Sequence, residues 1–230
     1  SLLNVVAGTA TIALTGIIAA RWVGPASRNG AAWMVALCPA LVYWTSTAHT
    51  ETVFTPLFLG VIVLSTWAMD SASRRRWVVV GLLVGAAFLV RSPGIIALVV
   101  PAAAIRATGR TWRGVPQATG LVVLGALVLL GPWTIRNGVQ VGIWTPASTN
   151  NAAAACFGHH EETQAEWNPG ELSAEMQQDC YGGSPFDDRR LLSLYTEGGL
   201  LPPGIALGDP DEARWYREAM GQAVRFAATH

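Results

Sequence analysis

The sequence contains no lysine, and only 13% of its 230 residues are charged, so the fixed positive charge comes from arginine alone. Soluble domains carry about 25% charged residues. Here the low charge accompanies 51% hydrophobic residues and a mean hydropathy of +0.36. These values exclude an ordinary soluble domain and predict a membrane protein. The preference for arginine over lysine, together with abundant alanine, glycine and valine, indicates a bacterial genome of high GC content.

Several motifs of soluble enzymes and of nucleic-acid-binding proteins are also missing. The sequence has no phosphate-binding glycine loop of the Walker type, no dinucleotide fingerprint and no basic patch suited to nucleic acid. The run His159-His160-Glu161-Glu162 consists of adjacent residues, which seldom converge on one ion, so we interpret it as a solvated turn. We predict no metal site and no cofactor, while a requirement for a divalent metal stays open.

Apolar runs of membrane-spanning length dominate the first 131 residues, since a helix needs roughly 20 apolar residues to cross about 30 Å of hydrocarbon. Four runs are clear: 1–20, 31–47, 52–69 and 115–131. A fifth stretch is divided by Arg91-Ser92-Pro93-Gly94 into two short pieces, 77–90 and 94–105. We predict a mainly α fold, a polytopic transmembrane helical bundle of about six membrane helices in which this pair is short.

The positions of the arginines indicate whether the two short pieces form one continuous helix or a hairpin. A continuous helix would separate Arg106, Arg110 and Arg113 from residues 74–76, whereas a hairpin keeps all six arginines on one side. Cytoplasmic loops carry the excess of basic residues, so we predict the hairpin. Arg21 and Arg28 then also face the cytoplasm.

Residues 132–230 have a different composition, with thirteen acids and six arginines against two acids and nine arginines in residues 1–131. We predict an extracytoplasmic, loop-rich region that follows the membrane core. Within it, only residues 211–229 show helical spacing, and we expect an amphipathic helix that packs on the membrane face or on its own domain. The predicted location is the bacterial inner membrane, crossed several times.

The outside location permits disulfides, so we predict that Cys156 and Cys180 pair, with two free thiols as the alternative. Cys38 lies in a predicted span. The chain begins inside an apolar run without a methionine or a basic leader. We therefore interpret it as a fragment that lacks the N-terminus and is truncated at the C-terminus.

Two charged residues beside the apolar runs are candidate binding residues. The hairpin places Arg91 near the outer surface, where a guanidinium suits a lipid phosphate and the break at Pro93 could supply free backbone amides. The alternative is an arginine that extends to lipid head groups. Glu51 also faces outside, where it could orient a sugar hydroxyl or pair with Arg91 or Arg136. Its alternative is an acid that stabilises a helix N-terminus.

Polar and aromatic residues follow the last predicted span. We expect residues 132–151 to form an ordered loop above the membrane, with Trp133 and Trp144 as stacking surfaces. Its hydrogen-bonding candidates for sugar or phosphate are Arg136, Asn137, Ser148, Thr149 and Asn150.

Three segments carry a resemblance to a known family: residues 49–54 (His-Thr-Glu-Thr-Val-Phe), residues 81–94 ending in Leu-Val-Arg-Ser-Pro-Gly, and residues 132–137 (Pro-Trp-Thr-Ile-Arg-Asn) with 145–150. Their order and spacing are similar to those of bacterial glycosyltransferase family 39, relatives of protein O-mannosyltransferases and the lipid A aminoarabinose transferase in the GT-C superfamily. The resemblance adds His49 to the substrate-binding candidates.

The resemblance implies an enzyme that moves a sugar from a polyprenyl-phosphate donor to a protein, lipid or glycan acceptor on the outer face of the membrane. It also implies a catalytic acid in a loop that would precede Ser1, so we expect this piece alone to be inactive. The residues at 150–153 and the two outside cysteines depart from the family's common pattern. A transporter or flippase and a non-catalytic protein that binds a lipid-linked sugar remain the alternatives.

Overall fold

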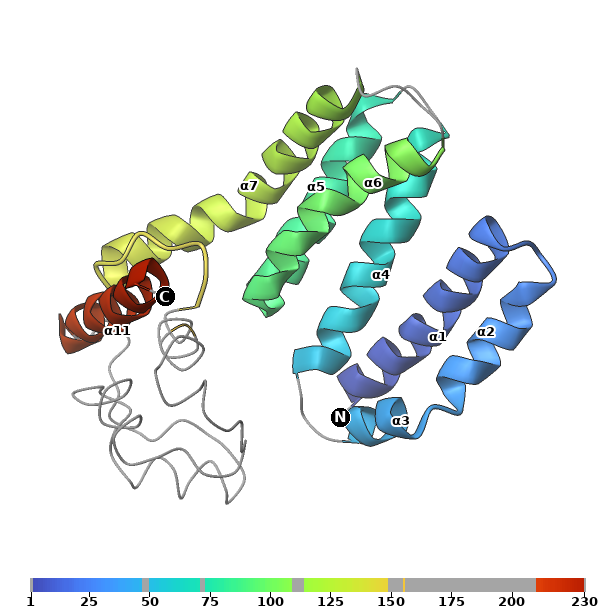
Figure 1. Ribbon diagram of the computed structural model, residues 1–230, viewed down its shortest axis with the longest axis horizontal. Helices are drawn as coiled ribbons and strands as arrows, with labels where there is room; N and C mark the ends of the chain where they lie inside the picture. Colours follow the sequence, from blue (N-terminus) through green and yellow to red (C-terminus); the bar gives the residue numbers. More distant parts are fainter. Residues whose placement is uncertain are drawn as a thin grey trace. The chain divides into compact units, whose positions relative to one another are not determined.

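The computed structural model describes residues 2–46, 50–70, 73–108, 114–148, 155 and 210–229, and every regular element in these ranges is helical (Figure 1). The chain divides into two compact units, Ser1–Pro132 and Trp133–His230. Each unit is described by itself below.

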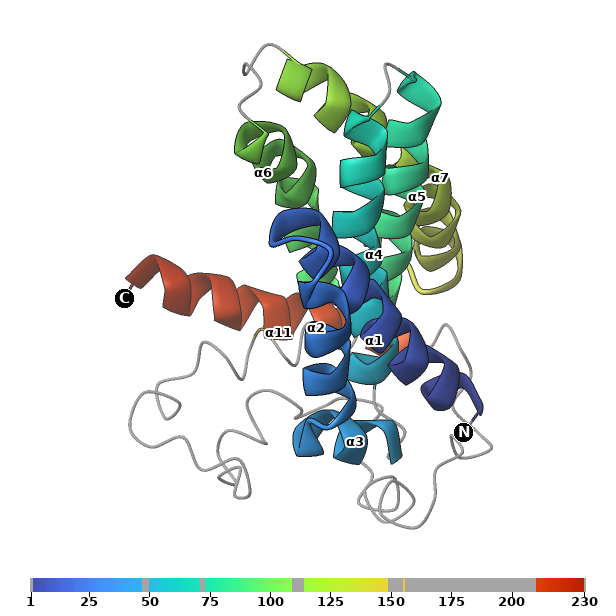
Figure 2. The ribbon, with the colours of Figure 1, turned by 90° about the vertical axis from the view of Figure 1, so that its right-hand side faces the viewer.

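The first unit is an array of helices that run back and forth. Its elements are α1 (Leu2–Trp22), α2 (Ser27–Ala36), α3 (Pro39–Ser46), α4 (Thr50–Met69), α5 (Arg74–Val90), the 3-10 helix η1 (Ser92–Leu98), α6 (Val99–Ala107) and the first part of α7 (Val115–Gln140). Helix α4 lies between α1 and α5, and it adjoins α5 in both ribbon views (Figures 1 and 2). It also contacts α6 and η1.

Three helices among the described residues, α1, α4 and α7, are long and apolar enough to span a membrane. This indicates a membrane protein. The prediction of one continuous span over residues 31–47 is wrong, because α2 ends at Ala36 and α3 begins at Pro39. Proline lacks an N–H donor and disfavours helical backbone in the residue before it, which explains a break at Leu37 and Cys38.

The change of direction predicted at Arg91-Ser92-Pro93-Gly94 is confirmed. Arg91 is extended, with φ −150° and ψ 133°, and η1 then returns along α5. A Cβ added at Gly94 would lie 2.7 Å from the backbone of Ala87, so the two legs meet at their backbones near the turn. At the opposite end, Trp77 packs against the cluster that contains Ile105.

The core of this unit consists of small and β-branched side chains. Val61, Val80, Val84, Ala97 and Val122 are almost completely buried together. Beside them the backbones of α5 and α7 touch, because a Cβ at Gly81 would overlap the carbonyl of Val122 and one at Gly125 would lie 3.0 Å from the Cα of Gly81. Close backbone approach at small residues is the usual basis of helix packing in membranes.

The second unit contains the last residues of α7 and helix α11 (Pro210–Thr229). Helix α7 continues to Gln140, so the expectation of a loop from residue 132 is wrong. A proline inside a helix removes one N–H donor and crowds the carbonyl four residues earlier, and α7 nevertheless continues past Pro132. The start of α11 agrees with the sequence prediction to one residue, and its Tyr216 packs against Val141 and Ile143 of the same unit.

Candidate functional site

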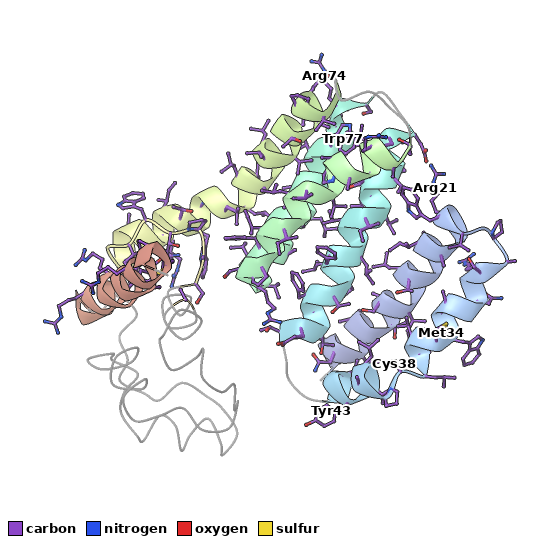
Figure 3. The ribbon with its side chains drawn as sticks, viewed as in Figure 1. Arg21, Met34, Cys38, Tyr43, Arg74 and Trp77 are labelled. Carbon is purple, nitrogen blue, oxygen red and sulfur yellow. The ribbon has the colours of Figure 1, made fainter. Side chains whose placement is uncertain are left out.

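The two ends of the first unit differ in charge. At one end Arg21 pairs with Asp70, and Arg76 stacks 4.2 Å from the ring centroid of Trp67 while donating a 2.8 Å hydrogen bond to its carbonyl. Figure 3 shows Arg21 and Arg74 at this end and Tyr43 at the other. In a membrane, the excess of arginine would face the cytoplasm.

The opposite end holds an ion pair between Glu51 and Arg91. Glu51 lies in the first turn of α4 and Arg91 at the turn between α5 and η1, and their closest atoms, Arg91 Nη1 and Glu51 Oε1, are 2.8 Å apart. This confirms one of the two pairings predicted for Glu51. The side chains are 38% and 40% exposed, so a guanidinium with five N–H donors remains accessible beside a carboxylate.

The backbone at this turn has fewer free N–H donors for an anion than we predicted from the sequence. Pro93 has no N–H, and the N–H of Gly94 donates to the carbonyl of Arg91 at 2.8 Å. The expectation of free amides at the break is therefore wrong for these two residues. The amide of Gly94 is used because the chain enters a 3-10 helix, whose bonds join residues three apart.

A cavity of about 450 Å³ adjoins Glu51 and is bounded by α1, α2, α3 and α4. Most of its described lining is aliphatic, and the polar side chains among these residues are Thr9, Thr11, Thr45, Thr52, Thr55 and Glu51. The sequence interpretation missed these threonines. The available signal was their recurrence in apolar runs on both sides of the polar segment that contains Glu51.

A second cavity of about 430 Å³ lies along α1 and α4 and reaches Leu83 of α5. Its lining is almost wholly aliphatic and includes Leu3, Leu14, Leu57 and Gly60. Such a surface suits a hydrocarbon chain and offers nothing to a polar head group.

The candidates of the second unit lie on the last turns of α7 and in the loop that follows it, and hydrogen bonds join the two. Arg136 stacks 4.8 Å from the ring centroid of Trp133 and donates to Asn137 Oδ1 at 3.2 Å. Asn137 is 2% exposed, and its Nδ2 donates to the carbonyls of Thr145 and Ala147 at 3.0 and 3.3 Å. The amide of Asn137 therefore holds the loop against the end of α7, while Ser148 is exposed.

The structure brings Glu51 together with Arg91, and Arg136 together with Asn137, each pair within one unit. Five predicted residues lie outside the described ranges: His49, Thr149, Asn150, Cys156 and Cys180. Among the residues that the structure does describe, no group of three histidine, cysteine or acidic side chains could hold a metal ion.

Comparison with known proteins found no match to a family model, to a curated protein or to a solved structure.

Proposed function

We propose that this chain is part of a membrane glycosyltransferase that moves a sugar from a polyprenyl-phosphate donor to an acceptor on the extracytoplasmic face. The observation that carries the proposal is the accessible Arg91–Glu51 pair at the end of the first unit opposite its arginine-rich end. In the full bundle of about six membrane helices expected from the sequence, this pair lies at the outer boundary of the membrane.

Arg91 is the proposed contact for the donor phosphate. A planar guanidinium binds phosphate oxygens through two parallel N–H donors, and it keeps its charge at any physiological pH. Since Glu51 already occupies Nη1 at 2.8 Å, phosphate binding would either use the remaining donors or displace the carboxylate. Displacement would release Glu51 to accept a hydrogen bond from a sugar hydroxyl.

The aliphatic cavity along α1 and α4 supports the lipid part of the donor. It belongs to the same unit as Arg91 and is large enough for several isoprene units. The bilayer would supply the environment for the rest of the chain. Arg136, stacked on Trp133, is the second phosphate candidate, on the separate unit.

One observation favours a second candidate function, binding of a lipid-linked sugar without catalysis. Glu51 is the carboxylate in the lining of the first cavity, and it is engaged by Arg91 rather than poised alone as a general base. Under this reading the chain would retain donor affinity and show no transfer.

The test measures transfer of radiolabelled sugar from polyprenyl-phosphate donors by the whole protein in membranes. Arg91→Ala is expected to lower transfer by at least a hundredfold, because removing a charged contact to phosphate costs about 3 kcal/mol. Arg91→Lys keeps the charge but loses the paired donors, so it should retain partial activity.

Arg21→Ala is the matched control, since it removes an arginine from an ion pair of the same kind at the opposite end of the unit. It should leave transfer within twofold of the unmodified protein at equal expression. If Arg91→Ala transfers sugar normally, Arg91 is not the phosphate contact. Donor binding with no transfer by the unmodified protein would favour the binding function.

A further inference from the structure

Four of the threonines that line the cavity beside Glu51 use their hydroxyl protons in hydrogen bonds to backbone carbonyls. Thr9, Thr11 and Thr45 donate their hydroxyl protons to the carbonyls of Val5, Ala7 and Val42 at 2.8, 2.9 and 2.7 Å. Thr55 donates to the carbonyl of Glu51 at 2.8 Å. A hydroxyl has one proton and two lone pairs, so these four threonines present acceptors to the cavity and not donors.

The rest of the lining reinforces this preference. Among the described residues that line the cavity there is no arginine, histidine, asparagine, glutamine or tryptophan, and the charged one is Glu51. At these four threonines and at Glu51, an anion would meet oxygen lone pairs and a negative charge, and the rest of the described lining is mainly aliphatic. The described lining thus disfavours phosphate and favours a group that donates several hydrogen bonds.

A cation is disfavoured for a different reason. The carboxylate of Glu51 is already matched by Arg91 at 2.8 Å, so an ammonium group would have to compete with that guanidinium. A neutral polyol needs no counter-charge and can donate to several acceptors at once. The aliphatic remainder of the lining suits the carbon face of a sugar ring or the start of an alkyl chain.

We infer that the cavity bounded by α1, α2, α3 and α4 binds a neutral, hydroxyl-rich glycosyl group attached to an aliphatic chain, with any phosphate held outside it. The inference rests on the proposed function for the role of this sugar as a reactant. The donor's own sugar and a glycolipid acceptor share this chemistry, and the experiment separates them.

The experiment uses photo-crosslinking of the whole protein in phosphatidylcholine nanodiscs prepared without alkyl glycoside detergents. Three probes carry the same diazirine-bearing decyl chain and end in glucose, in phosphate or in a glucosyl phosphodiester. Adducts are mapped by mass spectrometry. We expect both glucosyl probes to label α1 to α4 around the cavity and decyl phosphate not to label it.

The two glucosyl probes distinguish the sources. If the phosphodiester labels the cavity more strongly than decyl glucoside, and Arg91→Ala removes the difference, the occupant is the donor's sugar. Equal labelling by both probes, insensitive to Arg91→Ala, identifies an acceptor glycoside. Both results support a glycosyl cavity.

Thr9→Val and Thr55→Val each remove one acceptor while keeping the shape of the side chain. Each should weaken labelling by decyl glucoside about fivefold, the usual effect of one hydrogen bond. Thr15→Val is the matched control, because Thr15 makes the same bond to a backbone carbonyl, that of Thr11, but does not line the cavity. It should leave labelling unchanged.

Labelling by decyl phosphate at the cavity, or equal effects of Thr9→Val and Thr15→Val, would overturn the inference. The assay does not need turnover. Sugar transfer without glucosyl labelling of the cavity contradicts the inference alone, whereas threonine-dependent labelling without transfer contradicts only the proposed enzyme.

Discussion

Asn137 has a structural role, whereas the polar composition of its segment predicted a contact with a ligand. An amide in a polar segment predicts a ligand contact, but Asn137 lies near the end of α7. It donates to the carbonyls of Thr145 and Ala147 in the following loop and accepts from Arg136 on the same helix. No sequence pattern fixes this result, because it depends on the chain turning back at Gly142, which has φ +75°. The backbone there adopts a conformation that glycine accepts readily.

The first prediction concerns this clamp. Asn137→Ala should destabilise the loop by about 2 kcal/mol, since it leaves two carbonyls without their donor in a buried setting. The measurement is hydrogen exchange of residues 141–148, which should become at least tenfold faster. Val139→Ala, at an exposed position of α7 close to Asn137, should leave the exchange rates unchanged.

The second prediction separates function from stability at Glu51. The Glu51–Arg91 pair is more than a third exposed at both partners, so Glu51→Gln should change the free energy of unfolding by less than about 1 kcal/mol. Sugar transfer by the whole protein should nevertheless fall at least tenfold. A parallel loss of stability and activity would show that the pair is structural.

Arg91 and Glu51 could be identified as candidates from the sequence, because ionised groups next to hydrocarbon are energetically costly and usually have a function. The threonines of the cavity gave no such signal, since a threonine can satisfy its hydroxyl on its own helix. Which of them face one cavity follows only from how α1, α3 and α4 pack.

At the scale of elements, η1 explains how a short segment nearly matches its longer neighbours. A 3-10 helix rises about 2.0 Å per residue against 1.5 Å in an α-helix. The 7 residues of η1 and the 9 of α6 therefore extend about 27 Å, close to the roughly 30 Å of a bilayer core. A count of apolar residues therefore underestimates the length of the segment formed by η1 and α6.

The third prediction tests the contact between α5 and α7. Gly81→Ala places a methyl group against the Val122 carbonyl, so the helices must separate, at a cost of about 1–3 kcal/mol. Thermal stability in detergent should fall clearly. Gly120→Ala on α7, where an added Cβ meets nothing within 4 Å, provides the control and should not lower it.

On the scale of the whole molecule, composition was enough to predict a helical membrane protein, and arginine placement was enough to predict the reversal at Arg91. The helix ends were harder. Pro39 ends a run that hydropathy alone joins, whereas Pro132 lies inside a helix that continues for eight more residues. The same residue type therefore marks a helix boundary at Pro39 and lies inside a helix at Pro132, so proline alone does not fix a helix end.

The fourth prediction concerns orientation. In a cysteine-free background, Thr50→Cys near Glu51 should react with a membrane-impermeant maleimide added to intact cells. Ala107→Cys, an exposed position at the arginine-rich end, should react only after permeabilisation. The reverse pattern would invert the proposed orientation and remove Arg91 from the outer face.

The position of Arg91 at the tip of a hairpin also has a consequence for biosynthesis. In a bilayer, this guanidinium must be carried through hydrocarbon as α5 and η1 insert, a step that costs about 3 kcal/mol for an arginine at the membrane centre. Glu51 is translated earlier, at the start of α4. The Glu51 carboxylate would therefore already lie on the far side of the membrane when Arg91 crosses it. The ion pair of the candidate site would then first stabilise the newly inserted hairpin.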